Sequence, residues 1–93
     1  MTYISNAFSL GMLPQGASVQ IKELDSRPVL TDAVSIVGHQ DTAAILGLPF
    51  NRQSVSLNLG DTLFVAQYNG PRLPEGTTEL PDGASFRWFV VTI

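Results

Sequence analysis

The stretch Thr62-Leu63-Phe64-Val65-Ala66-Gln67-Tyr68 carries the strongest strand pattern in the chain. A turn with Gly60 precedes it, and residues 51–58 before that turn also have a strand pattern, so the two stretches predict a β-hairpin with a short loop. Residues 85–93 end the sequence with apolar side chains at nearly every position. Such a strand is covered on both faces of its sheet or lies at an interface.

A long loop joins the last two strands. Residues 69–84 contain three prolines and three glycines in sixteen positions, a composition typical of a loop. Loops of this length inside a compact domain usually bind ligands or cover a site. We therefore expect functional residues in this segment.

The N-terminal half is predicted to alternate short strands and short helices. Residues 2–4 have a strand pattern, and residues 7–13 place their apolar side chains on one face at helical spacing. Ser5 or Asn6 can cap this helix, because both side chains accept hydrogen bonds from the first free amides. Residues 17–24 alternate apolar and polar side chains, including an apolar Ile21, which predicts a half-buried strand.

Another strand and a helix follow. Residues 34–37 have a strand pattern, and Gln40 or Asp41 then opens a helix over residues 42–46. Gly47 suits the left-handed position that ends a helix. Strands and short helices in one chain predict an α+β (mixed α/β) fold.

Length and composition indicate a single domain, residues 1–93. A chain this short buries only about 60% of the surface that its unfolded form exposes, so association would stabilise it. Hydrophobic residues make up 44% of the sequence and charged residues 14%, which describes a globular chain with a surface poor in charge. Part of that surface is therefore expected to be covered by a partner.

Composition also excludes several classes of protein. The sequence has no cysteine, which excludes disulfides, thiolate catalysis and Cys-rich zinc sites. It has no run of about 18 apolar residues and no signal-peptide pattern, so we expect no membrane partner and a cytoplasmic location. The net charge of −3 argues against binding to long nucleic acids, but it permits a small ligand with a few phosphates.

The only histidine, His39, follows Gly38 and precedes the predicted helix start. A neutral imidazole can transfer protons near pH 7, and the unpaired amides of a helix start attract anions. A loop histidine that bonds only to its neighbours would have the same pattern. Too few ligands surround His39 to hold a metal, so we expect neither a metal nor a cofactor.

The long loop holds a second candidate pair, Arg72 and Glu75. They stand three positions apart in a turn stiffened by Pro74, so both can face one site, where the guanidinium can bind a phosphate through two hydrogen bonds. A surface ion pair would explain the same two residues. Arg52, at the start of a predicted strand, and Ser9, in the first predicted helix, are weaker candidates for phosphate or sugar contacts.

No Ser/His/Asp set, Gly-rich phosphate loop or paired-carboxylate motif is present. One histidine with several arginines suits the cleavage of a phosphodiester by the neighbouring ribose 2′-OH. The substrate supplies the nucleophile in that reaction, so the protein only aligns it and protonates the leaving oxygen. Such an enzyme is expected to work without a metal.

Four motifs, in this order, resemble those of the viral type III anti-CRISPR ring nucleases, a family of archaeal viruses and phages with bacterial relatives. They are Asn6-Ala7-Phe8-Ser9 followed by Met12-Leu13, then Ile36-Val37-Gly38-His39-Gln40-Asp41-Thr42, Asn51-Arg52 and Arg72-Leu73-Pro74-Glu75-Gly76. Each motif is weak alone, but together they span most of the chain.

The resemblance implies a homodimer whose mixed sheet of about five strands is flanked by helices. It also implies that the dimer binds cyclic tetra-adenylate, the second messenger of type III CRISPR defence, across its two-fold axis. Family members cut this ring without a metal into linear di-adenylates that end in a 2′,3′-cyclic phosphate. His39 is similar to the general acid of the family, and Arg72 and Glu75 are similar to its catalytic pair. The ligand contacts expected by the same resemblance are Asn6, Ser9, Gly38, Gln40, Asp41, Thr42 and Arg52.

Two other functions stay open at this stage. Residues 77–84 are too short for the helix that follows the arginine and glutamate motif in the family, which leaves room for a protein that holds the ring without cutting it. The other is a small dimeric regulatory protein that binds DNA or another protein, although the acidic balance counts against DNA. A viral protein that disarms the defence and a cellular one that ends the signal would share these motifs.

Overall fold

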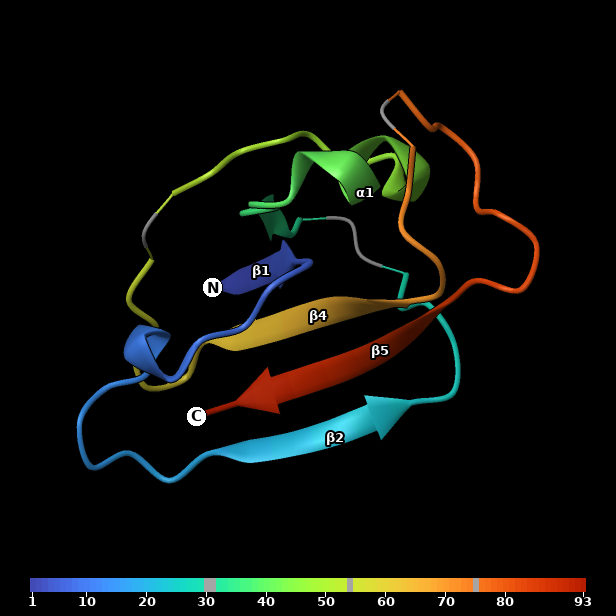
Figure 1. Cartoon of the computed structure of the whole chain (residues 1–93). Coiled ribbons are helices and arrows are strands. Elements are labelled where there is room, and N and C mark those ends of the chain that lie inside the picture. The colour runs from blue at the N-terminus through green and yellow to red at the C-terminus, as the bar shows by residue number, and fades with distance from the viewer. Residues whose placement is uncertain (30–31, 54, 75) are drawn as a thin grey trace.

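The computed structural model contains a five-stranded mixed sheet with very little helix (Figure 1). It describes residues 1–29, 32–53, 55–74 and 76–93, without the side chains of Leu10 and Asp41. The strand order is β2-β5-β4-β1-β3. In chain order the elements are β1 (Thr2–Ser5), the 3-10 helix η1 (Leu10–Met12), β2 (Gln20–Leu24), β3 (Val34–Ser35), α1 (Gln40–Leu46), β4 (Thr62–Asn69) and β5 (Ser85–Thr92).

The two apolar C-terminal segments form strands, as the sequence predicts, and they lie next to each other inside the sheet. β4 and β5 are antiparallel from the pair Thr62 and Thr92 to the pair Asn69 and Ser85. β5 is flanked by β2 on its other side, which makes it an interior strand. The long connection between β4 and β5 contains no helix or strand among its described residues, so its prediction as a loop is confirmed there.

The predicted hairpin between residues 51–58 and β4 is wrong. Both edges of β4 are already occupied, by β5 and by β1, so no edge is free for the preceding segment. The described residues of this segment form no strand. Instead Leu57, which is 1% exposed, packs into the core while its amide donates to the Met12 carbonyl at 2.7 Å.

Three neighbouring strands, β3, β1 and β4, are parallel to one another. Their carboxyl ends therefore lie at the same edge of the sheet. β3 is shorter than the strand predicted over residues 34–37, but the chain continues beside a second parallel segment through an isolated bridge between Val37 and Phe50. The Asn51 amide donates to the Val37 carbonyl at 3.0 Å, which extends this pairing.

The helices are fewer than predicted. The helix expected over residues 7–13 is only the three-residue η1, although the Ser5 hydroxyl oxygen accepts from the Ala7 amide at 3.1 Å. The Ser5 hydroxyl donates to the Ile36 carbonyl at 3.1 Å, and Asn6 bonds to the turn after β3. α1 forms where it was predicted, and Gly47 ends it with φ 70°, in the left-handed conformation.

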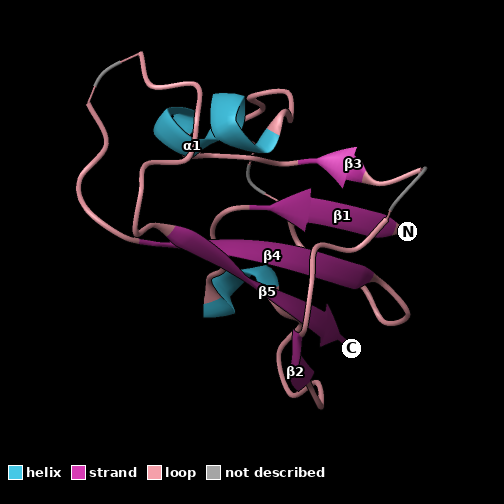
Figure 2. Cartoon of the chain, turned by 90° about the vertical axis from the view of Figure 1, so that its right-hand side faces the viewer, coloured by secondary structure: helices cyan, strands magenta, loops and turns pink. Residues whose placement is uncertain are grey.

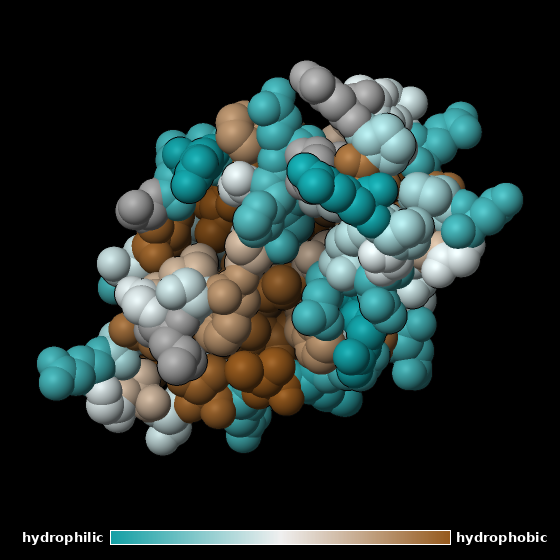
Figure 3. Space-filling view, viewed as in Figure 1, coloured by the Kyte–Doolittle hydropathy of each residue, from teal (hydrophilic) through white to brown (hydrophobic). Residues whose placement is uncertain are grey.

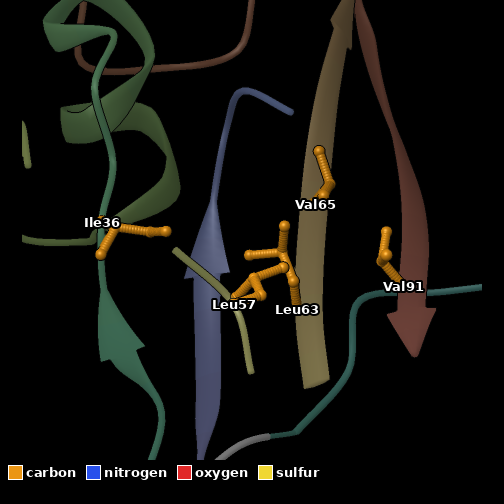
Figure 4. Close-up of a cluster of buried hydrophobic side chains, with 5 residues drawn as sticks. All are labelled: Ile36, Leu57, Leu63, Val65 and Val91. Carbon is orange, nitrogen blue, oxygen red and sulfur yellow. The ribbon is translucent and has the colours of Figure 1, made fainter. Parts of the chain in front are cut away.

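Each face of the sheet carries its own hydrophobic cluster. The first is built from Ile36, Leu57, Leu63, Val65 and Val91, which converge from β4, β5 and the segments around them (Figure 4). The second is built from Ile4, Leu46, Ala66 and Trp88. β5 contributes Val91 to the first cluster and Trp88 to the second, as expected for a strand with apolar side chains on both faces.

β2 is the exception to this packing. Ile21, predicted to be half-buried, is 55% exposed, because β2 is an edge strand and its side chains project beyond the first cluster. Figure 2 shows β2 at the opposite end of the sheet from β3 and α1, and the described part of the loop between β4 and β5 lies beside α1. Among the described residues, no helix combines the length and the hydrophobicity that crossing a membrane requires.

Asp61 closes the turn before β4, and its contacts make the free energy of unfolding fall as the pH is lowered into the acid range. Its carboxylate accepts from the Asn58 amide at 2.8 Å and from the Met1 ammonium at 3.1 Å. These contacts, the Asn58 amide first, lower the pKa of Asp61, so the unfolded chain takes up the proton more readily. The stabilisation is complete above about pH 5 and is lost as pH falls through the lowered pKa.

We therefore expect Asp61→Asn to destabilise the protein at pH 7 and to flatten its loss of stability on acidification. Urea unfolding at a series of pH values from 7 to 3 measures both effects. Asp25→Asn, an exposed aspartate in the turn after β2, is the matched control. Parallel stability curves for Asp61→Asn and the wild type would contradict this role.

Candidate functional site

The carboxyl edge of the three parallel strands brings distant segments together. Asn6 follows β1, Gly38 and His39 follow β3, and β4 ends nearby with Gln67 and Tyr68. Open sheets with parallel strands commonly bind ligands outside this edge. The edge is therefore the first place to look for a site.

The Asn6 carboxamide organises this edge. Its Oδ1 accepts from the Gly38 and His39 amides, each at 3.2 Å. Its Nδ2 donates to the His39 carbonyl at 2.8 Å and to the Thr42 hydroxyl. Two accepted and two donated bonds use the full capacity of a carboxamide. Asn6 thus fixes the backbone of the turn that carries His39.

This network uses part of the turn. The amides of Gly38 and His39 are bonded to Asn6, whereas the helix-start amides that the sequence suggested for an anion begin at Gln40. Thr42 is buried at 5% exposure, and its hydroxyl also reaches the His39 carbonyl at 3.5 Å. Direct ligand contacts by Asn6, Gly38 and Thr42 stay predictions.

His39 itself is exposed and occupies the position just before α1. Its backbone is extended, with φ −107° and ψ 108°, and its side chain makes no capping hydrogen bond to the helix. The backbone is thus held on both sides while the imidazole lines an open groove. A proton donor needs this combination of a fixed backbone and an accessible ring.

The groove has a volume of about 590 Å³ and runs across the sheet face beside His39. Apolar side chains gather on this face over β4, β5 and β2 (Figure 3). The polar lining residues are Asn6, His39, Thr42, Gln67 and Tyr68, and the apolar ones are Ala7, Phe8, Ile21, Val65, Phe89 and Val91. Polar groups therefore stand at one side of an apolar wall, an arrangement typical of ligand sites.

Three other candidate residues lie outside this lining, so far as the described residues show. Arg52 packs beside the turn that carries His39, because a Cβ built on Gly38 would lie 3.9 Å from the Arg52 Cγ. The Ser9 hydroxyl accepts from the Gly11 amide at 3.2 Å and closes the η1 turn. Arg72 is exposed on the loop after β4.

The remaining candidates fall at or beyond the limits of the structure. Gln40 is the first residue of α1 and lines a second hollow of about 560 Å³, between α1 and the loop residues Leu73, Pro74, Gly76, Thr77 and Thr78. Asp41 lies in α1, but its side chain is outside the described part, and Glu75 is outside the described residues altogether. The predicted pairing of Arg72 with Glu75 is therefore untested.

Arg87 and Glu23, beside the apolar wall, form an ion pair with each other. Arg87 donates to Glu23 through Nη2 at 2.7 Å and through Nε at 3.1 Å, and its guanidinium lies 5.3 Å from the Phe89 ring centre. The hydrogen bonds from Arg87 lower the pKa of Glu23, and the same contacts raise the pKa of Arg87. No three His, Asp or Glu side chains of the described part gather closely enough to hold a metal ion.

Sequence reasoning missed the wall of the groove. Gln67, Tyr68 and Phe89 were assigned to strands or to the core, and their place beside His39 depends on the parallel pairing of β1 with β4. Residues that pair in this way are about 60 positions apart, and no local pattern records the pairing.

Comparison with known proteins identifies the family. The model of the STIV B116-like family matches residues 2–82. The chain belongs to this family. Among solved structures, B116 of Sulfolobus turreted icosahedral virus is similar over 99% of this chain and 98% of that chain, with a TM-score of 0.74 and 22% sequence identity.

That likeness to a viral B116 protein shows a shared fold. It agrees with the mixed sheet of about five strands that the motifs of the sequence implied. No curated protein sequence matches the chain.

The Asn6 network predicts a specific cost for its removal. Asn6→Ala would remove the acceptor of the Gly38 and His39 amides, and each lost hydrogen bond should lower the free energy of unfolding by about 0.5–1.5 kcal/mol. Urea denaturation measures the loss, and Asn69→Ala, an exposed asparagine at the end of β4, is the control. Equal stability of the two variants would show that the network does not hold the turn.

Proposed function

We propose that the protein is a homodimeric, metal-independent ring nuclease. It cuts cyclic tetra-adenylate into linear di-adenylates that end in a 2′,3′-cyclic phosphate, and so switches off type III CRISPR signalling. The four sequence motifs and membership of the STIV B116-like family support this function. The observation that carries it is the exposed His39 side chain, presented from a fixed backbone at the edge of a groove.

The proposed reaction uses the substrate's own nucleophile. The 2′-oxygen attacks the adjacent phosphorus and loses its proton to water, and the bond from phosphorus to the 5′-oxygen breaks. The His39 imidazolium gives its proton to the departing 5′-oxygen. Arg52, packed beside Gly38, and Arg72 on the loop supply positive charge to the phosphate oxygens. The protein then contributes alignment, one proton and charge.

A dimer suits both the ligand and the surface. A ring of four identical nucleotides has a two-fold axis, and two opposite cuts release two di-adenylates, so two His39 side chains would each make one cut. The exposed Ile21 continues the apolar wall of the groove to the edge of the sheet. We assign this apolar face to contact with the second copy.

Binding without turnover is a second candidate function. Of the three residues predicted to be catalytic, only His39 lines the groove in the described structure. A protein that holds the ring through the groove and the arginines, but cuts it too slowly to matter, would fit the same geometry. Calorimetry that shows tight binding of the ring with no product would favour this candidate.

His39→Ala tests the catalytic assignment. Removing a general acid is expected to slow cleavage about 10²–10⁴-fold while binding of the ring, measured by calorimetry, changes little. Gln15→Ala, an exposed residue after η1 that lines neither hollow, is the control. A His39→Ala variant that cuts at the wild-type rate would remove His39 from this role.

Ile21→Glu tests the dimer surface. A charge in the apolar interface should convert the dimer into a monomer of 10.0 kDa in size-exclusion chromatography with light scattering. Leu59→Glu changes a side chain of greater exposure, 83%, in the turn before β4 and should stay dimeric. A wild type that is monomeric at all concentrations, or an Ile21→Glu variant that still dimerises, would contradict the assignment.

A further inference from the structure

The two ends of the loop that carries Arg72 lie close together at Gly70 and Ala84, and we call this contact the neck of the loop. Its two ends continue the register of β4 and β5, in which Tyr68 pairs with Phe86 and Asn69 pairs with Ser85. The Tyr68 hydroxyl donates to the Pro71 carbonyl at 2.7 Å. Pro71 directly precedes Arg72, so this bond fixes the backbone next to the arginine.

The Tyr68 ring is oriented by its own contacts. It meets Phe86 edge to face, with the ring centres 5.7 Å apart and the planes at 62°. Tyr68 is also one of the residues that line the groove together with His39. Tyr68 therefore contacts both the groove and the first residues of the loop.

Close packing at Gly70 completes the neck. A Cβ built on Gly70 would lie 2.6 Å from the Ala84 Cβ and 3.0 Å from the Tyr68 hydroxyl oxygen. Contacts this short are not tolerated without a shift of the chain. The two ends of the loop thus meet at Gly70 and Ala84, and the Tyr68 hydroxyl lies in the same contact.

We propose that Tyr68 is a positioning residue whose hydroxyl, bonded to the Pro71 carbonyl at the neck closed by Gly70 and Ala84, directs Arg72 toward the ring phosphate. This inference rests on the proposed ring-nuclease function. It gives Tyr68 a role that acts through Arg72 and requires no contact with the substrate. Tyr68→Phe separates the two parts of the side chain, because it keeps the ring on Phe86 and removes only the hydrogen bond.

A double-mutant cycle on cleavage of cyclic tetra-adenylate measures the coupling. Tyr68→Phe should lower kcat/KM about 3- to 10-fold, the range expected for one neutral hydrogen bond at the surface. In the Arg72→Ala background the same change should have no effect. Tyr3→Phe is the control. It removes a hydroxyl that donates to the Met1 sulfur near the start of β1, and it should leave kcat/KM unchanged. An equal fall in both backgrounds, or no fall at all, would overturn the inference.

Trypsin digestion tests the same placement without any nucleotide. Arg52 and Arg72 are the tryptic sites outside strands, since Lys22 and Arg87 lie in β2 and β5 and Arg27 precedes a proline. Tyr68→Phe should raise cleavage after Arg72 relative to cleavage after Arg52 about 3- to 10-fold, and Tyr3→Phe should not. An unchanged ratio overturns the positioning role. If the wild type neither binds nor cuts the ring, the proposed function fails, and this ratio still decides whether Tyr68 holds the loop.

Discussion

The fold and the site depend on one side chain, the Asn6 carboxamide. β3 pairs with β1 over only two positions, so the main chain alone provides little to hold the segment that follows it. Side chains at the end of β1 continue the pairing where the strand stops. Ser5 bonds to the Ile36 carbonyl, and Asn6 bonds four groups of the turn and of α1. The turn that presents His39 is therefore part of the sheet's hydrogen-bond network.

In this arrangement the main chain of the turn is fixed by hydrogen bonds, and the His39 side chain is available for a reaction. The main chain of Gly38 and His39 is bonded to Asn6, whereas the imidazole stays free to face the groove. The groove in turn joins two kinds of surface, a polar side at the carboxyl edge of the parallel strands and an apolar wall over β4, β5 and β2 (Figure 3). A nucleotide bound as we propose would present phosphates and sugars to the first kind of surface and bases to the second. Ile21, at the sheet edge of this wall, is the residue that we propose for contact with a second copy of the chain.

The sequence predicted which segments form strands and helices more reliably than it predicted which strands pair with one another. β4, β5 and β1 were placed correctly, and Gly47 ends α1 as expected, because periodicity and turn residues act locally. The hairpin partner of β4 was wrong, because β1 occupies that edge from a distant part of the sequence. Asn6 was assigned to a local cap, yet its partners lie more than thirty positions away. For the site, the motifs include Asn6, His39 and Thr42, which the fold brings together, while the groove wall depends on strand pairing that no local pattern records.

The central claim is that this chain cuts a cyclic oligonucleotide through the 2′-OH of its substrate, with His39 as the proton donor. The most direct measurement is ³¹P NMR of cyclic tetra-adenylate incubated with the protein in excess EDTA. The account predicts that the ring phosphodiester signal falls while a 2′,3′-cyclic phosphate signal appears, at one cyclic phosphate for each di-adenylate formed. A ring that stays intact after long incubation with the protein in excess would contradict it.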